Sequence, residues 1–164
     1  MSNVNENSRS ESFTKLCKKW LELIAFLHII GGLSLSFNWP SVIWYEYQQR
    51  LLELFSIGSE VGTGVSVGAR FESIMSMLIQ LFGPTIASWG ILMFYLIRRI
   101  NIDSLSSDEN KNNINILLLA TSVWFVLDTT ISLNFGVMLH AVINMLAALS
   151  ILLPLVYLRF RKGE

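Results

Sequence analysis

The sequence contains little charge, a single cysteine and no excess of basic residues, and these shortages exclude several classes of protein. Charged residues make up 15% of the 164 residues, whereas an ordinary soluble domain has about 25%. The lone cysteine, Cys17, cannot form a disulfide within the chain, which excludes a disulfide-stapled secreted domain. The 12 basic residues balance the 12 acidic ones, so the chain lacks the net positive charge typical of nucleic-acid-binding proteins.

Long apolar runs are what the sequence has in abundance, since 52% of its residues are hydrophobic. Four of these runs approach or exceed the length of about 20 residues that crosses a bilayer core. The predicted spans cover about 20–37, 74–97, 114–133 and 137–158. Only Asn134, Phe135 and Gly136 separate the last two spans, which predicts a tight antiparallel helical hairpin. We therefore predict an all-α fold, an integral membrane four-helix bundle that forms a single membrane domain over residues 1–164.

The first apolar run has one alternative interpretation, a cleavable signal peptide. Basic residues precede the run, and the small residues of Ser34-Leu35-Ser36 lie near its end. The run is longer than the apolar region of a signal peptide, which has about 7–15 residues, and His28 interrupts it. We therefore interpret this segment as an uncleaved span.

The basic residues predict the orientation of the spans, because Lys and Arg are enriched in cytoplasmic segments. The loop between the first two spans, 38–70, contains only Arg50 and Arg70. The other ten basic residues lie on the opposite side: Arg9, Lys15, Lys18, Lys19, Arg98, Arg99, Lys111, Arg159, Arg161 and Lys162. This asymmetry predicts a multi-pass membrane protein with both termini in the cytoplasm. The polar segments 1–15 and 101–113 are then a disordered cytoplasmic arm and a cytoplasmic loop.

The outer loop contains an aromatic amphipathic pattern. Trp44, Tyr47, Leu51 and Phe55 recur at intervals of three and four residues, which is the spacing of one helix face. A helix of this kind lies in the bilayer interface, and Trp39, Trp44 and Tyr47 are its expected interfacial residues. An extramembrane helix that caps the bundle explains the same pattern, and the sequence does not separate the two.

Each predicted span carries one stripe of small and polar residues. Helices in lipid associate through close packing of small side chains and through hydrogen bonds. The stripes are therefore expected to face inward, leaving large apolar side chains toward lipid. They consist of Ala25, His28, Gly32 and Ser36 in the first span; Ser73, Ser76, Gln80, Gly83, Ala87 and Gly90 in the second; Thr121, Asp128 and Ser132 in the third; and Gly136, His140, Asn144 and Ala148 in the fourth.

Five polar residues of these spans are candidates for a functional site: Asp128, His140, Asn144, Gln80 and His28. A carboxylate inside a span is costly, by up to about 2.5–3.5 kcal/mol on insertion scales. Counted at about 1.5 Å per residue from the hairpin turn, Asp128 and His140 lie at the same depth, roughly 6–9 Å below the outer surface. The cluster is either a clamp that fixes the hairpin or a proton-relay or ligand site, and the sequence leaves both open.

No cofactor or metal is expected. The two histidines invite a bis-histidine haem, but helix geometry places His28 about 9 Å deeper than His140, and axial ligands must approach one iron from opposite sides. A metal site needs three or four ligands, and Asp128 adds only one to the histidines. Catalytic motifs such as HExxH are missing, so an enzyme is not favoured. Cys17, beside Lys18 and Lys19, is a candidate for S-acylation.

The third span carries a string, from Trp124-Phe125 through Asp128-Thr129 to Ser132, that is followed by Gly136, Asn144 and Pro154. This W-F-x-x-D-T-x-x-S signature resembles that of a group of small, uncharacterised bacterial four-span inner-membrane proteins. The second-span string Gly83-Pro84-Thr85-Ile86-Ala87-Ser88-Trp89-Gly90 also looks like that group. The resemblance implies a bacterial inner-membrane location and no known activity. His140 departs from the group's pattern, in which an Asn is expected.

These observations predict a small non-enzymatic inner-membrane protein that acts through helix packing with itself or with other membrane components. A small oligomeric transporter or proton-linked carrier that uses Asp128 and His140 is the alternative. A membrane enzyme acting on a lipid or quinone is a further alternative. The expected partners are membrane lipids and either a homo-oligomer or another membrane protein, and no nucleic acid.

Overall fold

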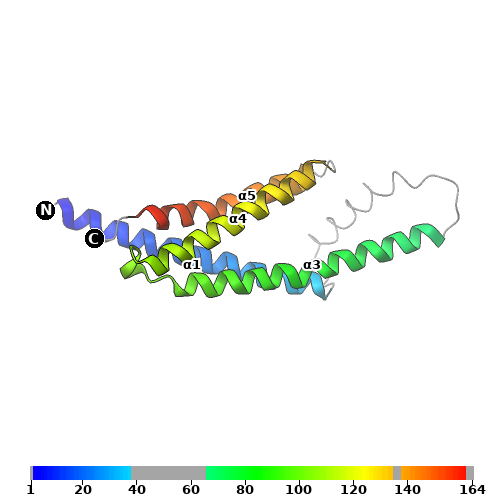
Figure 1. Cartoon of the computed structure of the whole chain (residues 1–164), viewed down its shortest axis with the longest axis horizontal. Helices are drawn as coiled ribbons and strands as arrows, with labels where there is room; N and C mark the ends of the chain where they lie inside the picture. Colours follow the sequence, from blue (N-terminus) through cyan, green and yellow to red (C-terminus); the bar gives the residue numbers. More distant parts are fainter. Residues whose placement is uncertain (1, 38–65, 135–137, 162–164) are drawn as a thin grey trace. The chain divides into compact units, whose positions relative to one another are not determined.

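The computed structural model describes residues 2–37, 66–134 and 138–161, and these residues form helices and no strand (Figure 1). The elements are α1 (Ser2–Ser36), α3 (Ser66–Arg99), a short 3₁₀ helix η1 (Ile102–Ser104), α4 (Asp108–Asn134) and α5 (Met138–Phe160). Three segments are long and apolar enough to cross a membrane, namely Gln80–Arg99 within α3, α4 and α5. The all-α prediction is confirmed for the described residues, as is the prediction of helices able to span a membrane.

The start of the chain differs from the predicted disordered arm, because α1 already begins at Ser2. Packing on α5 explains the difference. Thr14 is fully buried, and the ring of Phe13 meets that of Tyr157 edge to face, with 4.8 Å between centroids. Lys15 and Glu11, which lie one turn apart, form an ion pair that further stabilises this part of α1. Tertiary contacts therefore order a segment whose polar composition favours disorder.

The predicted cytoplasmic loop is also shorter than expected, because α4 begins at Asp108 and not near residue 114. Asn110 organises the connection. Its side-chain amide donates to the carbonyl oxygens of Asn101, at 3.0 Å, and Ser104, at 2.7 Å, and its side-chain oxygen accepts from the Asn101 N–H. A buried Asn that satisfies three backbone groups holds the chain close to the first turn of α4.

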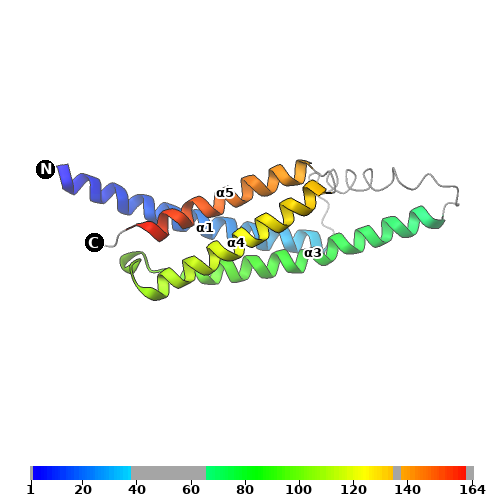
Figure 2. The same ribbon diagram turned by 45° about the horizontal axis from the view of Figure 1, so that its top comes forward.

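The chain forms two compact units, one of residues 1–26 and 92–164 and one of residues 27–91. In the first unit, α4 and α5 lie side by side as an antiparallel hairpin (Figures 1 and 2). The first part of α1 runs antiparallel to α5. Trp20 of α1 donates to the Ser150 carbonyl of α5 at 3.0 Å. Phe13 lies seven residues before Trp20 and meets Tyr157, which lies seven residues after Ser150. The hairpin predicted from the short connection after Asn134 is confirmed, while residues 135–137 lie outside the described part.

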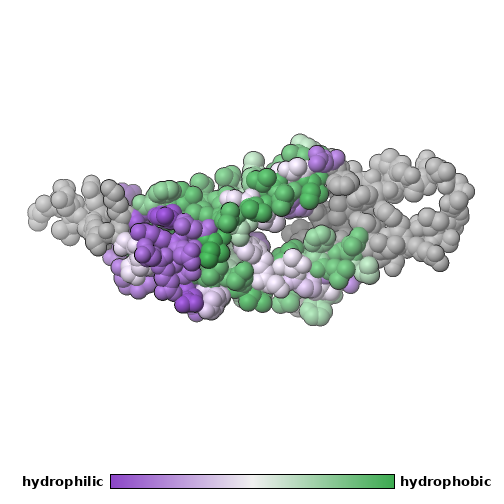
Figure 3. Space-filling model, in the orientation of Figure 1, coloured by the Kyte–Doolittle hydropathy of each residue, from purple (hydrophilic) through white to green (hydrophobic). Residues whose placement is uncertain are grey.

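The seam between the helices of the first unit follows the predicted stripes. Its buried residues on α5 recur at intervals of three and four: Ala141, Asn144, Ala148, Ile151, Leu155 and Leu158. Those on α4 are Asn113, Ile114, Leu117, Thr121 and Ser132, while the buried Asn110 belongs to the connection before the helix. Large apolar side chains cover the outward faces, and Leu119 and Leu146 are 68% and 60% exposed. Figure 3 shows hydrophobic residues along α4 and α5 and hydrophilic ones gathered at the end where α3 leads into α4.

In the second unit, α1 and α3 approach so closely that their backbones touch at glycines. A Cβ added to Gly32 would lie 2.5 Å from the carbonyl oxygen of Gly83 and 2.9 Å from the Cα of Ala87. A Cβ added to Gly83 would lie 2.5 Å from the carbonyl oxygen of Gly32. Only glycine permits this separation, which is the small-residue packing typical of membrane helices. The inward orientation predicted for Gly32, Gly83 and Ala87 is confirmed.

This crossing predicts that Gly32→Ala lowers the free energy of unfolding by about 1–3 kcal/mol, because the new methyl group forces backbones apart. Gly31→Ala is the matched control, since no described atom lies within 4 Å of its added Cβ. That control should be neutral or slightly stabilising, because Ala is a better helix former than Gly. Thermal unfolding in mild detergent, followed by circular dichroism, measures both. Equal unfolding temperatures for the two variants would contradict the close crossing.

Candidate functional site

Four polar side chains meet near the closed end of the α4–α5 hairpin. Asp128 and Ser132 lie one turn apart on α4, and His140 and Asn144 lie one turn apart on α5. Because a helix repeats every 3.6 residues, each pair occupies one face of its helix. The short connection between the helices then brings the two pairs to the same level.

Hydrogen bonds join the two helices at this point. The side-chain amide of Asn144 donates to Oδ2 of Asp128 at 2.8 Å, and Oγ of Ser132 lies 3.0 Å from Nδ1 of His140. Ser132 and Asn144 are almost completely buried, whereas the His140 and Asp128 side chains are 29% and 31% exposed. The cluster therefore has a closed side inside the hairpin and an open side formed by the Asp–His pair.

The direction of these hydrogen bonds determines which nitrogen of His140 faces the carboxylate. Ser132 donates its single hydroxyl proton to the main-chain carbonyl of Asp128 at 2.7 Å, so its oxygen accepts a proton from Nδ1 of His140. The other ring nitrogen, Nε2, lies 3.7 Å from Oδ2 of Asp128. In a neutral ring, Nε2 would present a lone pair to the carboxylate. The contact becomes an attractive ion pair when Nε2 also carries a proton.

The structure brings together three of the five predicted site residues, Asp128, His140 and Asn144. His28 and Gln80 lie in the second unit, on α1 and α3. The predicted interfacial residues Trp39, Trp44 and Tyr47, and with them the amphipathic helix of the outer loop, lie outside the described residues. Ser132 belongs to the cluster although it was predicted only as part of the inward stripe. Its position four residues after Asp128 was the signal that could have identified it.

Three other polar groups of α4 are buried. Among the described residues, Nδ2 of Asn113 and the hydroxyls of Thr121 and Thr129 are buried without a hydrogen-bond partner. Thr121 is fully buried two turns before Asp128, on the same side of α4. Such groups are costly in hydrocarbon, and here the protein itself covers them.

Cys17 is a poor substrate for S-acylation. Its side chain is only 6% exposed, and burial raises the pKa of its thiol, which lowers the fraction of reactive thiolate at neutral pH. Within the described ranges, no three His, Cys, Asp or Glu side chains come together as a metal site would require.

The chain was compared with protein-family models, with curated proteins and with solved structures, and none of the three comparisons found a match. The interpretation of the cluster therefore depends on its own chemistry.

The hydrogen bond from Asn144 predicts a graded response at position 128. Asp128→Asn retains an oxygen that accepts this bond and should leave the unfolding temperature in detergent nearly unchanged. Asp128→Leu removes the acceptor and leaves Asn144 buried without this partner, which should cost about 1–2 kcal/mol. Thr130→Val is the control, because it removes only an exposed hydrogen bond within α4.

Thermal unfolding of the four proteins measures the series. Equal stability of the wild type, Asp128→Asn and Asp128→Leu would show that the bond across the hairpin does not stabilise it. If the carboxylate carries protons, Asp128→Asn should fold normally and yet lose a proton flux that the wild type catalyses in vesicles.

Proposed function

We propose that this protein is a four-span protein of the cell inner membrane, with both termini in the cytoplasm, that works by helix packing and not by catalysis. Its helices associate with a second copy or with other membrane components. The observation that carries the proposal is the cluster at Asp128, whose polar groups bind one another across the α4–α5 hairpin and so hold two helices together. The apolar part of α1, which contains Glu22 and His28, completes the four spans together with the apolar segments of α3, α4 and α5.

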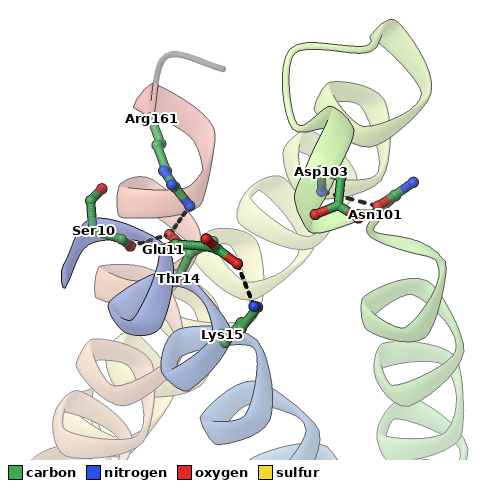
Figure 4. A network of polar contacts seen from close by, with 7 residues as sticks. All are labelled: Ser10, Glu11, Thr14, Lys15, Asn101, Asp103 and Arg161. Carbon is green, nitrogen blue, oxygen red and sulfur yellow. Dashed lines mark hydrogen bonds and ion pairs between the residues drawn. The ribbon is translucent and has the colours of Figure 1, made fainter. Parts of the chain in front are cut away.

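Contacts at the polar end of the first unit support four crossings. The ammonium of Lys18 donates to the carbonyl oxygen of Ile100 at 2.6 Å, joining the start of α1 to the connection before α4. Arg161, just after α5, donates to Thr14 of α1, and Thr14 donates to the Ser10 carbonyl at 2.9 Å (Figure 4). The start of α1, the α3–α4 connection and the end of α5 therefore lie together. A chain that returns twice to the same end has crossed an even number of times.

The charge at this end supports its assignment to the cytoplasm. Nine basic residues of the described chain belong to these segments: Arg9, Lys15, Lys18, Lys19, Arg98, Arg99, Lys111, Arg159 and Arg161. Several of them also stabilise helix ends, as Lys18 does at the last carbonyls of α3 and Arg99 does through its ion pair with Glu109, at 2.9 Å. Enrichment in Lys and Arg is the property that retains a segment in the cytoplasm.

Reporter fusions test this topology. Fusions after Ser12 and Gly163 should give cytoplasmic signals, and an insertion at Gly62 should give a periplasmic signal, because ten of the 12 basic residues lie on the side of the two termini. The insertion at Gly62 is the internal control, since the three sites must not all report the same compartment. A periplasmic signal from the fusion after Gly163 would overturn the four-span arrangement.

The string from Trp124 to Ser132 supports placing the protein with the small bacterial four-span proteins that it resembles. The proposal also includes an interfacial helix in the outer loop around Trp44 and Tyr47, supported by their spacing.

A proton-linked carrier is the second candidate, and one observation favours it. Nε2 of His140 lies 3.7 Å from Oδ2 of Asp128, so a proton taken up by this nitrogen would turn the contact into an ion pair. Both side chains are about one-third exposed, which gives a proton a route to the pair. A carrier of this size would operate as an oligomer, since four spans leave little room for a gated cavity.

Self-association is the expected behaviour of a protein that works by helix packing. Native mass spectrometry from a mild detergent should show multiples of the 18.6 kDa chain, or a complex with a second membrane protein. Substituting the exposed Leu127 and Leu146 by Ala should shift the distribution toward the monomer if α4 and α5 form the contact, whereas Phe26→Ala on α1 serves as the control. A chain that remains monomeric at every concentration and binds no protein would contradict the packing role.

A further inference from the structure

Two stripes of residues adjoin on α4 and α5 at the polar end of the first unit. Lys111, Asn115 and Leu119 follow one another at intervals of four residues and form one stripe along α4. On α5, the other stripe consists of Arg159, Val156, Leu152 and Leu149, at intervals of three and four residues. The two stripes meet where Nε of Arg159 donates to Oδ1 of Asn115 at 2.8 Å. This hydrogen bond holds the guanidinium of Arg159 beside α4.

The two cations of these stripes, Lys111 and Arg159, form no ion pair with a carboxylate in the described parts of the chain. The ion pairs near this end join Arg99 to Glu109 and Lys15 to Glu11, and neither of them includes Lys111 or Arg159. Asn115 is a neutral acceptor and occupies only Nε of Arg159. The terminal nitrogens of the guanidinium form a fork that matches two oxygens of a phosphate, and Lys111 adds a second charge on the neighbouring helix.

The rest of the two stripes is apolar and largely exposed. Leu119, one turn beyond Asn115, is 68% exposed, and on α5 the side chains of Val156 and Leu149 are 42% and 45% exposed. These residues belong to α4 and α5, which are apolar enough to cross a membrane. The two stripes thus have an amide and two cations without a carboxylate partner at one end, where Arg159 also lies over the ring of Phe160, and exposed apolar side chains leading away from them.

We propose that these two stripes bind one anionic phospholipid, with its phosphate on Arg159 and Lys111 and an acyl chain along Leu119, Leu149 and Val156. Clusters of basic residues at the cytoplasmic ends of spans are the recognised chemistry for anionic headgroups. A zwitterionic lipid presents the same phosphate together with a positive charge, which the two cations repel. The inference rests on the placement of this end in the cytoplasm, but it concerns lipid binding and not the packing role.

Lipid retention in native mass spectrometry tests the site. The whole protein in mild detergent is mixed with phosphatidylglycerol or with phosphatidylcholine of the same acyl chains. The wild type should retain phosphatidylglycerol about tenfold more strongly, because each basic residue near a headgroup contributes to the attraction. The double substitution of Lys111→Gln and Arg159→Gln should lower this preference to near unity. Arg9→Gln with Lys19→Gln is the matched control, because it also removes two positive charges and should retain the preference.

Each outcome decides the proposal. Equal loss in both double variants would show a general effect of charge and would overturn the site, as would retention by the Lys111/Arg159 variant. Displacement of the lipid by inorganic phosphate at millimolar concentration would indicate a site for free anions and would also overturn it. If the double variant fails to fold, Arg159→Lys replaces it, since it keeps the charge but loses the fork and should reduce the preference at least about twofold. The topology fusions are unaffected by any of these results.

Discussion

The hydrogen bond between Asn144 and Asp128 is the interaction on which the α4–α5 hairpin depends. It places a carboxylate, which is costly inside a span, against a buried amide on the neighbouring helix at 2.8 Å. An apolar seam alone gives little reason for two helices to prefer each other over lipid, because lipid tails are equally apolar. A polar group that finds its partner only across the hairpin does supply that preference, and it also specifies the register of the two helices.

The same constraint explains the composition of the other helix contacts. Small or polar residues are buried where the helices approach most closely, as with Gly32 against Gly83, and Thr121, Asn144 and Ala148 are buried on α4 and α5. Large apolar residues such as Leu117 and Leu155 fill the rest of the interior, and others cover the outward faces. At the polar end, Lys18 and Arg161 tie α1 to the α3–α4 connection and to the end of α5. Close backbone packing therefore holds α1 against α3 in the second unit. Charged contacts hold the helix ends together in the first unit.

The candidate site has a structural half and an open half, and this division relates the two functions considered. Ser132 and Asn144 are buried and bind across the hairpin, which is what a clamp requires. His140 and Asp128 are partly exposed and separated by 3.7 Å, with hydrogen bonding that directs Nε2 toward the carboxylate. A proton carried by Nε2 would make this contact an ion pair. The clamp thus positions the pair, whichever of the two roles the pair performs.

The sequence alone determined the helical class, the apolar segments and the meeting of Asp128, His140 and Asn144, because helical periodicity and a three-residue connection leave few alternatives. Tertiary structure decided what depends on distant partners. Residues 2–15 are helical because Phe13 and Thr14 pack on α5, although their composition favours disorder. Ser132 belongs to the site because it contacts His140 on α5. The first turn of α4 forms because the Asn110 side chain binds the connection before it. The local sequence pattern shows which face of a helix is polar. Only the packing of the helices determines which neighbouring group forms hydrogen bonds with that face.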